Sequence, residues 1–318
     1  MSAAARPADP RPIILDCDPG HDDALALLLA LARPEVRLLG VTTVAGNATL
    51  DNVTRNALAV LTLVGRMDVP VAVGAAEPLS RPLVTAAHVH GAGGLEGAEL
   101  PAPAFSPVEE SAVDFIARSV AQSDLPVTLV PTGPLTNIAH FIRRHPELLG
   151  GIDHICLMGG AMGEGNITAS AEFNIWVDPE AAAIVFDCGR PVTMIGLDVT
   201  HQAIVTGADA ERMATRGNRT GLVFADLLRY FARFHEQRYG WDGSPIHDAV
   251  AIAHVLDLGL VETRPFRVDV ETQSDLTRGR TVVDLRGLTG RPANAHVGLT
   301  IDRPRFVKLL EGAVGAHP

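Results

Sequence analysis

Short apolar runs rich in β-branched residues alternate with segments whose apolar residues recur at helical spacing. The apolar runs predict strands at residues 13–18, 36–44, 69–73, 127–131, 152–158 and 192–197. The segments between them predict helices at residues 22–33, 50–64, 109–122, 135–144 and 179–187. This repeated alternation favours an α/β fold with a doubly wound, mostly parallel, Rossmann-like sheet.

The alternation ends beyond residue 200. Residues 208–257 have the pattern of helices only, residues 266–301 that of strands, and residues 304–311 that of a final helix. No shift in composition marks a linker, so we expect residues 11–318 to form a single domain with extra helices and strands in its C-terminal third. Residues 1–10 read as a flexible tail.

Composition narrows the class of protein. The chain has 318 residues, 47% of them hydrophobic, which suffices for a large core. Its 26 basic and 37 acidic residues give a net charge of −11, which argues against a nucleic-acid partner. The longest apolar run is too short to span a bilayer, and the N-terminal segment lacks the apolar stretch of a signal peptide. Three cysteines are too few for a disulfide framework, so we expect a reduced, cytoplasmic setting. The short apolar runs lead us to expect no contact with a membrane.

Four aspartates fall within eight residues of the segment DCDPGHDD: Asp16, Asp18, Asp22 and Asp23. The first two end the first predicted strand, and the last two open the helix that follows. Ligands bind beyond the carboxyl ends of strands in open α/β sheets. One aspartate there could simply cap a turn, but four like charges must hold protons or share a cation. Oxygen ligands of this kind favour a hard divalent cation, Ca²⁺ or Mg²⁺.

Two phosphoryl-transfer designs are poorly supported. A phosphatase of the haloacid dehalogenase type also ends its first strand with Asp-x-Asp, but it needs a later lysine, and the single lysine here, Lys308, lies in the last predicted helix. A P-loop needs a Gly-Lys-Ser/Thr segment, which the sequence lacks.

Polar residues also follow the later predicted strands, in the segments VAGNATL, HVHGAGGLEG, PTGPLTN and GNITASAEFN, and the segment SPIHDAVAI places His247 and Asp248 near the start of an apolar helix. Each has an ordinary structural interpretation alone, but together they place polar groups along one edge of the sheet. Amides and carboxylates suit the hydroxyl groups of a sugar. Carboxylates also stabilise the oxocarbenium-like transition state of glycosidic cleavage, a cation can activate water, and a histidine can protonate the departing group. The set therefore points to hydrolysis at a sugar.

The segment ILDCDPGHDDALALLLAL closely resembles the N-terminal signature of the inosine–uridine nucleoside hydrolases. The segments GNATL, HGAGGL, TGPLTN, MGG, GNITASAEFNIWVDPEAA, GLDVT and HDA extend the resemblance, in that order, over nearly the whole chain. The resemblance implies the nucleoside hydrolase fold, a tightly held Ca²⁺, and hydrolysis of the N-glycosidic bond of ribonucleosides to ribose and free base, for purine or pyrimidine salvage. It also implies a homotetramer or homodimer.

The resemblance further implies roles for individual residues. Asp18 is expected to be the general base and a calcium ligand, and His247 the acid for the leaving group. Asp16 would hold the calcium ligands in place without binding the ion itself. The further calcium ligands would be Asp23, the backbone carbonyl of Thr132, and Asp248. The substrate-binding residues would be Asp22, Asn47, Asn166, Glu172 and Asn174 at the ribose, Met158 through its backbone, and His90 on the base side.

Two questions stay open at this point. A non-catalytic nucleoside- or sugar-binding protein of the same fold is the competing class, although a binder would not need Asp18. The preference between purine and pyrimidine bases is also open. Residues that could face the base lie at 227–241, and the sequence does not say which of Phe231, Phe234, His235, Arg238 and Tyr239 do so.

Overall fold

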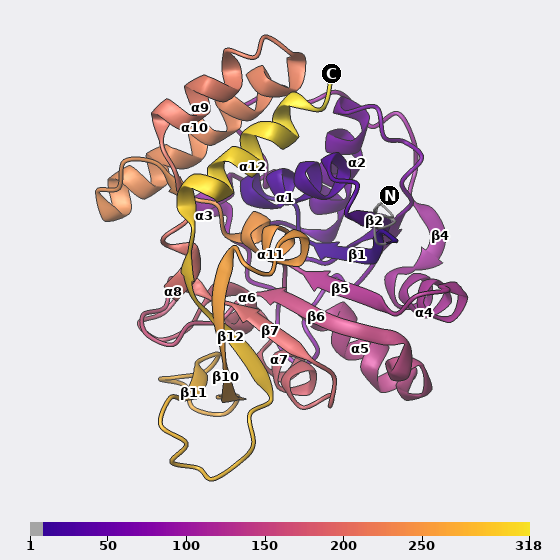
Figure 1. Ribbon diagram of the computed structural model, residues 1–318, viewed down its shortest axis with the longest axis vertical. Helices are drawn as coiled ribbons and strands as arrows, with labels where there is room; N and C mark the ends of the chain where they lie inside the picture. Colours follow the sequence, from indigo (N-terminus) through magenta and orange to yellow (C-terminus); the bar gives the residue numbers. More distant parts are fainter. Residues whose placement is uncertain (1–8) are drawn as a thin grey trace, which may run out of the picture.

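The computed structural model describes residues 9–318, and its ten-stranded sheet has the order β11-β10-β12-β7-β6-β5-β1-β2-β3-β4 (Figure 1). The strands are β1 (Arg11–Cys17), β2 (Val36–Thr43), β3 (Val71–Val73), β4 (Val108–Ser111), β5 (Val127–Pro131), β6 (Ile152–Met158), β7 (Val192–Ile195), β10 (Val261–Val270), β11 (Thr281–Asp284) and β12 (Ala295–Ile301). Neighbouring strands are parallel except where β10 pairs with β11 and β12.

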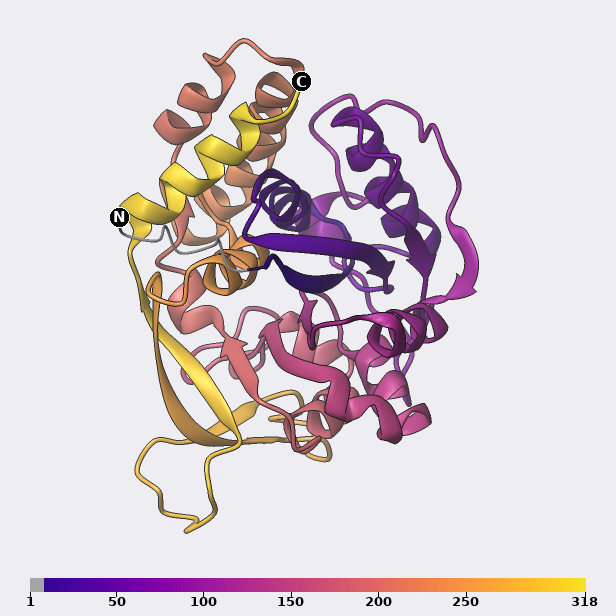
Figure 2. The ribbon, with the colours of Figure 1, turned by 45° about the vertical axis from the view of Figure 1, so that its right-hand side comes forward.

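Helices cover both faces of this sheet, because successive strand residues point to opposite sides. In β1, Ile13 and Leu15 belong to one core cluster and Ile14 to the other. The first cluster lies under α1 (His21–Ala32), α2 (Leu50–Leu63), α9 (Gly207–Ala214), α10 (Arg219–Tyr239), α11 (His247–Leu256) and α12 (Arg303–Gly315). The second lies under α4 (Ala112–Gln122), α5 (Thr136–Arg144) and α7 (Pro179–Phe186). Figure 2 shows the strands β10 and β12 extending away from these layers.

The direction of winding reverses at β1. The chain runs outward from β1 through β2 and β3 to β4, and then crosses back to place β5 on the other side of β1. A crevice opens at the carboxyl ends of the strands where the winding reverses, and ligands of doubly wound proteins bind there. Asp18 directly follows β1, and Thr132 directly follows β5, so both stand at this position.

The predicted α/β fold is confirmed, and β5 and β6 have the predicted bounds. Several local predictions were wrong. Residues 109–111, predicted as helix, belong to β4, which pairs with β3, and Ser111 then caps α4 by accepting a hydrogen bond from the backbone N–H of Asp114. The region predicted as helical only contains β9 (Ser244–Pro245), which pairs with β8 (Ile204–Val205). Strand β7 stops at Ile195, because Leu197 already opens the short helix α8 (Leu197–Thr200).

Shorter elements were not predicted at all. They are α3 (Ala87–His90), the 3₁₀ helix η1 (Pro146–Gly151) and α6 (Phe173–Val177). Residues 1–8 of the predicted tail lie outside the described residues, and the single-domain organisation stays a prediction. Between residues 9 and 318, no helix combines the length and the apolar character needed to cross a membrane.

Candidate active site

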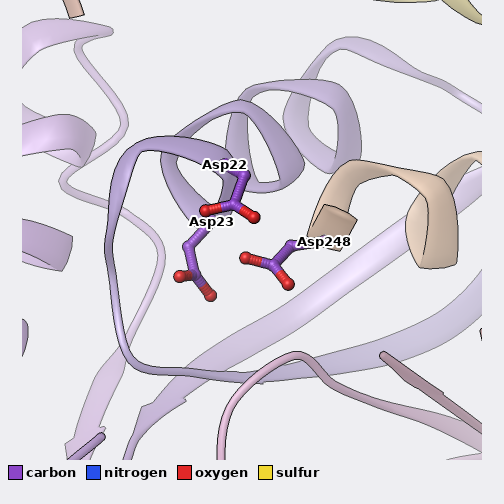
Figure 3. A group of neighbouring side chains, drawn as sticks. All are labelled: Asp22, Asp23 and Asp248. Carbon is purple, nitrogen blue, oxygen red and sulfur yellow. The ribbon is translucent and has the colours of Figure 1, made fainter. Parts of the chain in front are cut away.

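Three carboxylates converge between two helix N-termini (Figure 3). Asp22 and Asp23 lie in the first turn of α1, and Asp248 lies in the first turn of α11. One carboxylate oxygen from each lies within 4.8 Å of the others, and all three side chains are buried. The backbone N–H of Gly20 donates a 3.0 Å hydrogen bond to Oδ2 of Asp23, which fixes the start of α1. The positive ends of both helix dipoles favour negative charge at this point.

Burial makes this arrangement costly without a cation. It raises the pKa of Asp22 to about 7, with the neighbouring Asp23 adding to the shift. Burial followed by repulsion from the other aspartates raises the pKa of Asp248 well above its usual value, and burial also raises the pKa of Asp23. Only a bound cation allows all three to stay charged together. Because every donor is a carboxylate oxygen, the group fits a hard divalent ion better than zinc.

Asp18 lies beside this group rather than within it. Its Oδ2 accepts a 2.7 Å hydrogen bond from the backbone N–H of Asn47, while Oδ1 is buried without a hydrogen-bond partner. Burial, with repulsion from Asp23, raises the pKa of Asp18 well above its usual value. A Cβ at Gly46 would lie 2.1 Å from Oδ2 of Asp18, and a Cβ at Gly133 would lie 2.6 Å from Oδ1. Glycine at both positions therefore makes room for this carboxylate.

Asp16 points into the protein below Asp18. Its Oδ1 accepts hydrogen bonds from Thr42 Oγ1 at 2.5 Å and Asn137 Nδ2 at 2.8 Å, while Oδ2 is buried without a partner. Burial raises the pKa of Asp16 to about 7, against the opposing effect of these two hydrogen bonds. Asp16 thus ties β1 to β2 and α5 through Thr42 and Asn137.

Asn47 and Thr132 connect the carboxylates to one another. Asn47 Nδ2 donates to the backbone carbonyl of Asp18 at 3.1 Å and to Oδ2 of Asp23 at 3.3 Å. Thr132 Oγ1 donates to Oδ1 of Asp23 at 2.8 Å. The backbone carbonyl of Thr132 accepts a 2.7 Å hydrogen bond from Asn174 Nδ2 and keeps a second lone pair.

A polar wall extends from these residues along the loop before α6. Glu172 caps α6 by accepting from the backbone N–H groups of Asn174 at 2.9 Å and Ile175 at 3.1 Å, and it also accepts from Gly160 N at 3.0 Å. Burial raises the pKa of Glu172 to about 7. Asn166 Oδ1 accepts from the backbone N–H of Phe173 at 2.9 Å, so its Nδ2 stays available as a donor.

Another part of the pocket lining is aromatic and rich in histidine. His247 Nδ1 lies 2.7 Å from Thr200 Oγ1, and the His247 ring meets the His201 ring edge to face at 5.7 Å. Burial lowers the pKa of His247 well below its usual value. Trp241 stacks on His235 at 5.9 Å and meets His201 edge to face at 5.0 Å. This part of the lining offers flat apolar surfaces of the kind that suit a nucleobase.

Most of the predicted residues share one pocket. It is lined by Thr132, His247, Asp248 and all seven predicted substrate-binding residues, namely Asp22, Asn47, His90, Met158, Asn166, Glu172 and Asn174. Asp18 and Asp23 lie behind this lining and reach it through Asn47 and Thr132. Of the candidates in α10, the pocket is lined by Phe231, Phe234, His235 and Tyr239 but not by Arg238.

Sequence reasoning missed His201 and Trp241, which also line the pocket. His201 directly follows α8, just beyond the end of β7, so the rule that located the other loops could have found it. Trp241 follows Gly240, whose positive φ of 70° ends α10 and turns the chain back toward the pocket. No spacing signal marks such a residue in advance.

Comparisons with known proteins agree with this geometry. Residues 13–308 match the model of the family described as inosine-uridine preferring nucleoside hydrolase. A pyrimidine-specific ribonucleoside hydrolase, RihA, of Shewanella sp. (strain ANA-3) is 54% identical over 96% of this chain and 97% of its own length. The protein of the same name from Salmonella arizonae is 51% identical over 94% of this chain and 96% of its own. A solved purine-preferring ribonucleoside hydrolase from Gardnerella vaginalis has a TM-score of 0.90 and 36% identity, covering 96% of this chain and 98% of its own.

Proposed function

Because the chain belongs to the inosine-uridine preferring nucleoside hydrolase family, we propose that this ribonucleoside hydrolase acts on pyrimidine ribonucleosides at a site that holds calcium. It is an enzyme that cleaves the N-glycosidic bond, and the competing class of a non-catalytic binder is therefore set aside. The observation that carries the proposal is the convergence of buried carboxylates at a pocket that polar and aromatic side chains also line.

The preference for pyrimidines rests on relatives. Proteins named as pyrimidine-specific share more than half of their residues with this chain across nearly its full length. The purine-preferring relative from Gardnerella vaginalis shares 36%. Since both kinds have this fold, the side chains of the pocket must decide the base, and the aromatic part of the lining is the part that would contact it.

Four groups are proposed to hold the cation: Asp18, Asp23, Asp248 and the backbone carbonyl of Thr132. The buried Oδ1 of Asp18 has no other partner, and Asp23 and Asp248 already belong to the group of three carboxylates. Asp22 is assigned to the sugar on the family resemblance, with its carboxylate beside those of Asp23 and Asp248. A cation bound there would supply positive charge to neutralise the carboxylates and to acidify water. The all-oxygen donor set supports a hard divalent cation, and the family resemblance supports calcium.

The chain's own residues would divide the reaction between them. Asp18 is proposed to act as the general base and to take a proton from the attacking water. The hydrogen bond from the backbone N–H of Asn47 would hold its carboxylate in place. Asp22, Asn47, Asn166, Glu172 and Asn174 would bind the ribose hydroxyls, and the Met158 carbonyl would contribute from the backbone. His247 would place a proton on the departing base, with Thr200 orienting its ring.

Specificity constants for uridine, cytidine, inosine and 2′-deoxyuridine test the proposal in one experiment. Uridine or cytidine should be the best substrate. 2′-Deoxyuridine should be at least about a hundredfold worse, because a site built to bind a hydroxyl leaves its own polar groups unpaired when that hydroxyl is missing. Inosine as the best substrate would contradict the pyrimidine preference. Equal rates on uridine and 2′-deoxyuridine would contradict the proposed ribose contacts.

The assembly and the setting are also proposed. A homotetramer or homodimer that salvages nucleosides in the cytoplasm fits the family resemblance. Light scattering coupled to size-exclusion chromatography measures the assembly directly, and a mass of 33.6 kDa, that of one chain, would contradict it.

A further inference from the structure

Two buried histidines contact each other beside the pocket through atoms that cannot both donate. Nδ1 of His21 lies 3.0 Å from Nδ1 of His90. The other ring nitrogen of His21, Nε2, lies 2.7 Å from the backbone carbonyl oxygen of Glu96. His21 therefore stands between a fixed acceptor and a second imidazole.

The carbonyl of Glu96 determines where the protons lie. A carbonyl oxygen only accepts, so Nε2 of His21 must carry the hydrogen. A neutral imidazole has one N–H, so Nδ1 of His21 is then a bare acceptor. Nδ1 of His90 must in turn donate across the 3.0 Å contact, which leaves Nε2 of His90 without a hydrogen.

The surroundings of both rings favour this neutral state. His21 is 1% exposed and His90 is 6% exposed. The His21 ring stacks between Phe231, at 5.0 Å, and Tyr230, at 5.4 Å, and the His90 ring also stacks on Phe231.

The loop of residues 90–96, which supplies the Glu96 carbonyl, is itself closed by a hydrogen bond to His90. The backbone N–H of Glu96 donates to the backbone carbonyl of His90 at 3.3 Å, which closes residues 90–96 into a compact loop. Gly20 packs against the Nδ1 side of the His90 ring, where a Cβ would lie 2.8 Å from Nδ1. This side of the ring therefore faces the protein. His90 lines the pocket, and its Nε2 has no hydrogen-bond partner among residues 9–318.

We propose that His21 is a positioning residue that holds His90 as its Nδ1–H tautomer, so that Nε2 of His90 accepts a hydrogen bond from an N–H group of the nucleobase. On this basis His90 selects bases by their donors and does not itself protonate the leaving group. In uridine the donor is the N3–H of uracil, and in cytidine it is the exocyclic amine. The substrate part of this inference rests on the proposed function, whereas the tautomer part does not.

Long-range ¹H–¹⁵N spectra of the histidine rings test the tautomer directly. In the wild-type enzyme, His90 should carry its proton on Nδ1 and His21 on Nε2, with the His90 signals identified by their loss in His90→Asn. Two variants of His21 separate the proton arrangement from simple packing. His21→Gln can still donate to the Glu96 carbonyl and accept from His90, so the His90 tautomer should persist. His21→Phe keeps a flat ring but neither function, so His90 should gain the Nε2–H form.

Uridine and 3-methyluridine test the consequence for recognition, because the methyl group removes the only N–H of the uracil ring. The wild-type enzyme should favour uridine by at least about tenfold in specificity constant, the scale of a lost hydrogen bond that leaves an acceptor unpaired. His21→Gln should keep this ratio, and His21→Phe should lower it by about fivefold or more. Elemental analysis of both variants checks that the neighbouring carboxylates still bind metal.

Several results would overturn the inference. An Nε2–H tautomer of His90 in the wild-type enzyme contradicts it, as does an unchanged substrate ratio in His21→Phe. If no ribonucleoside is hydrolysed at all, the proposed function fails, yet the spectra still decide the tautomer. If His21→Phe does not fold, the wild-type spectra and His21→Gln still provide the test.

Discussion

The backbone N–H of Asn47 donates a 2.7 Å hydrogen bond to Oδ2 of Asp18, whereas Oδ1 of Asp18 has no protein partner. The carboxylate is thus held at one oxygen, and the other is the atom that we propose takes the proton from water. Asp18→Asn keeps the shape of the side chain but cannot accept a proton from water. We expect turnover of uridine to fall by about 10²–10⁴-fold.

The fold of Asp18→Asn should survive, because the change removes one charge from a buried cluster of like charges. Thermal unfolding and metal content therefore serve as controls alongside turnover. Turnover close to that of the wild-type enzyme, with metal bound, would show that Asp18 is not the base.

Asp248 provides the test of the metal. Elemental analysis of protein purified without chelator should find about one calcium per chain. Asp248→Asn removes one carboxylate charge from the group of three and should weaken calcium binding in isothermal titration. The exposed Asp51, changed to Asn, is the matched control and should bind as the wild type does. Zinc in place of calcium, or full activity with no metal present, would contradict the proposed site.

The dependence of the rate on the leaving group tests whether His247 acts as the acid. His247→Ala should slow uridine hydrolysis far more than hydrolysis of a p-nitrophenyl riboside, because p-nitrophenolate departs as a stable anion and needs no proton. Thr200→Val removes the 2.7 Å partner of His247 Nδ1 and should produce a smaller loss with the same dependence on leaving group. Equal losses on both substrates would assign His247 to binding or structure.

Because His254 is buried, we expect the free energy of unfolding to depend on pH. His254 lies in α11, and its burial, with the nearby His154 adding to the effect, lowers its pKa to about 4. Its pKa in the unfolded chain is about 6.5, so between these values the unfolded state binds more protons than the folded one. The contribution of His254 to the free energy of unfolding is therefore complete above pH 6.5 and decreases as the pH falls toward 4.

Urea unfolding of wild type and His254→Leu measures this contribution. The stability of the wild type relative to His254→Leu should fall by up to about 1.4 kcal/mol per pH unit over that interval. A constant difference between wild type and His254→Leu from pH 7 to pH 4 would contradict the expectation.

Periodicity and short motifs predicted much of this molecule. The alternation of apolar residues located β5 and β6 to the residue, and the loops after the strands led to polar residues of the pocket lining such as Asn47, Thr132 and Glu172. These features are local, because strand patterning and loop polarity depend on neighbours in sequence. The edge strand β4 was missed since its residues, Val108–Ser111, have little apolar character and pair on one side only.

The remaining features of the site depend on contacts between distant segments. The pairing of His21 with His90 requires residues 90–96 to fold back and offer the Glu96 carbonyl, which no spacing reveals. Likewise, no spacing reveals that the carboxylates of Asp22, Asp23 and Asp248 lie together in the structure. Which carboxylates meet is determined by how α1 and α11 approach each other.

That approach of α1 and α11 has a consequence for synthesis on the ribosome. Helix α1, whose residues 21–30 are all buried, emerges early, but its packing partners α11 and α12 are among the last elements to be made. Until residue 248 has left the exit tunnel, a nascent chain holds an exposed apolar helix and only two of the three clustered carboxylates. Productive folding must therefore wait until translation is nearly complete, and chains truncated before α11 are expected to depend on chaperones and to bind metal poorly.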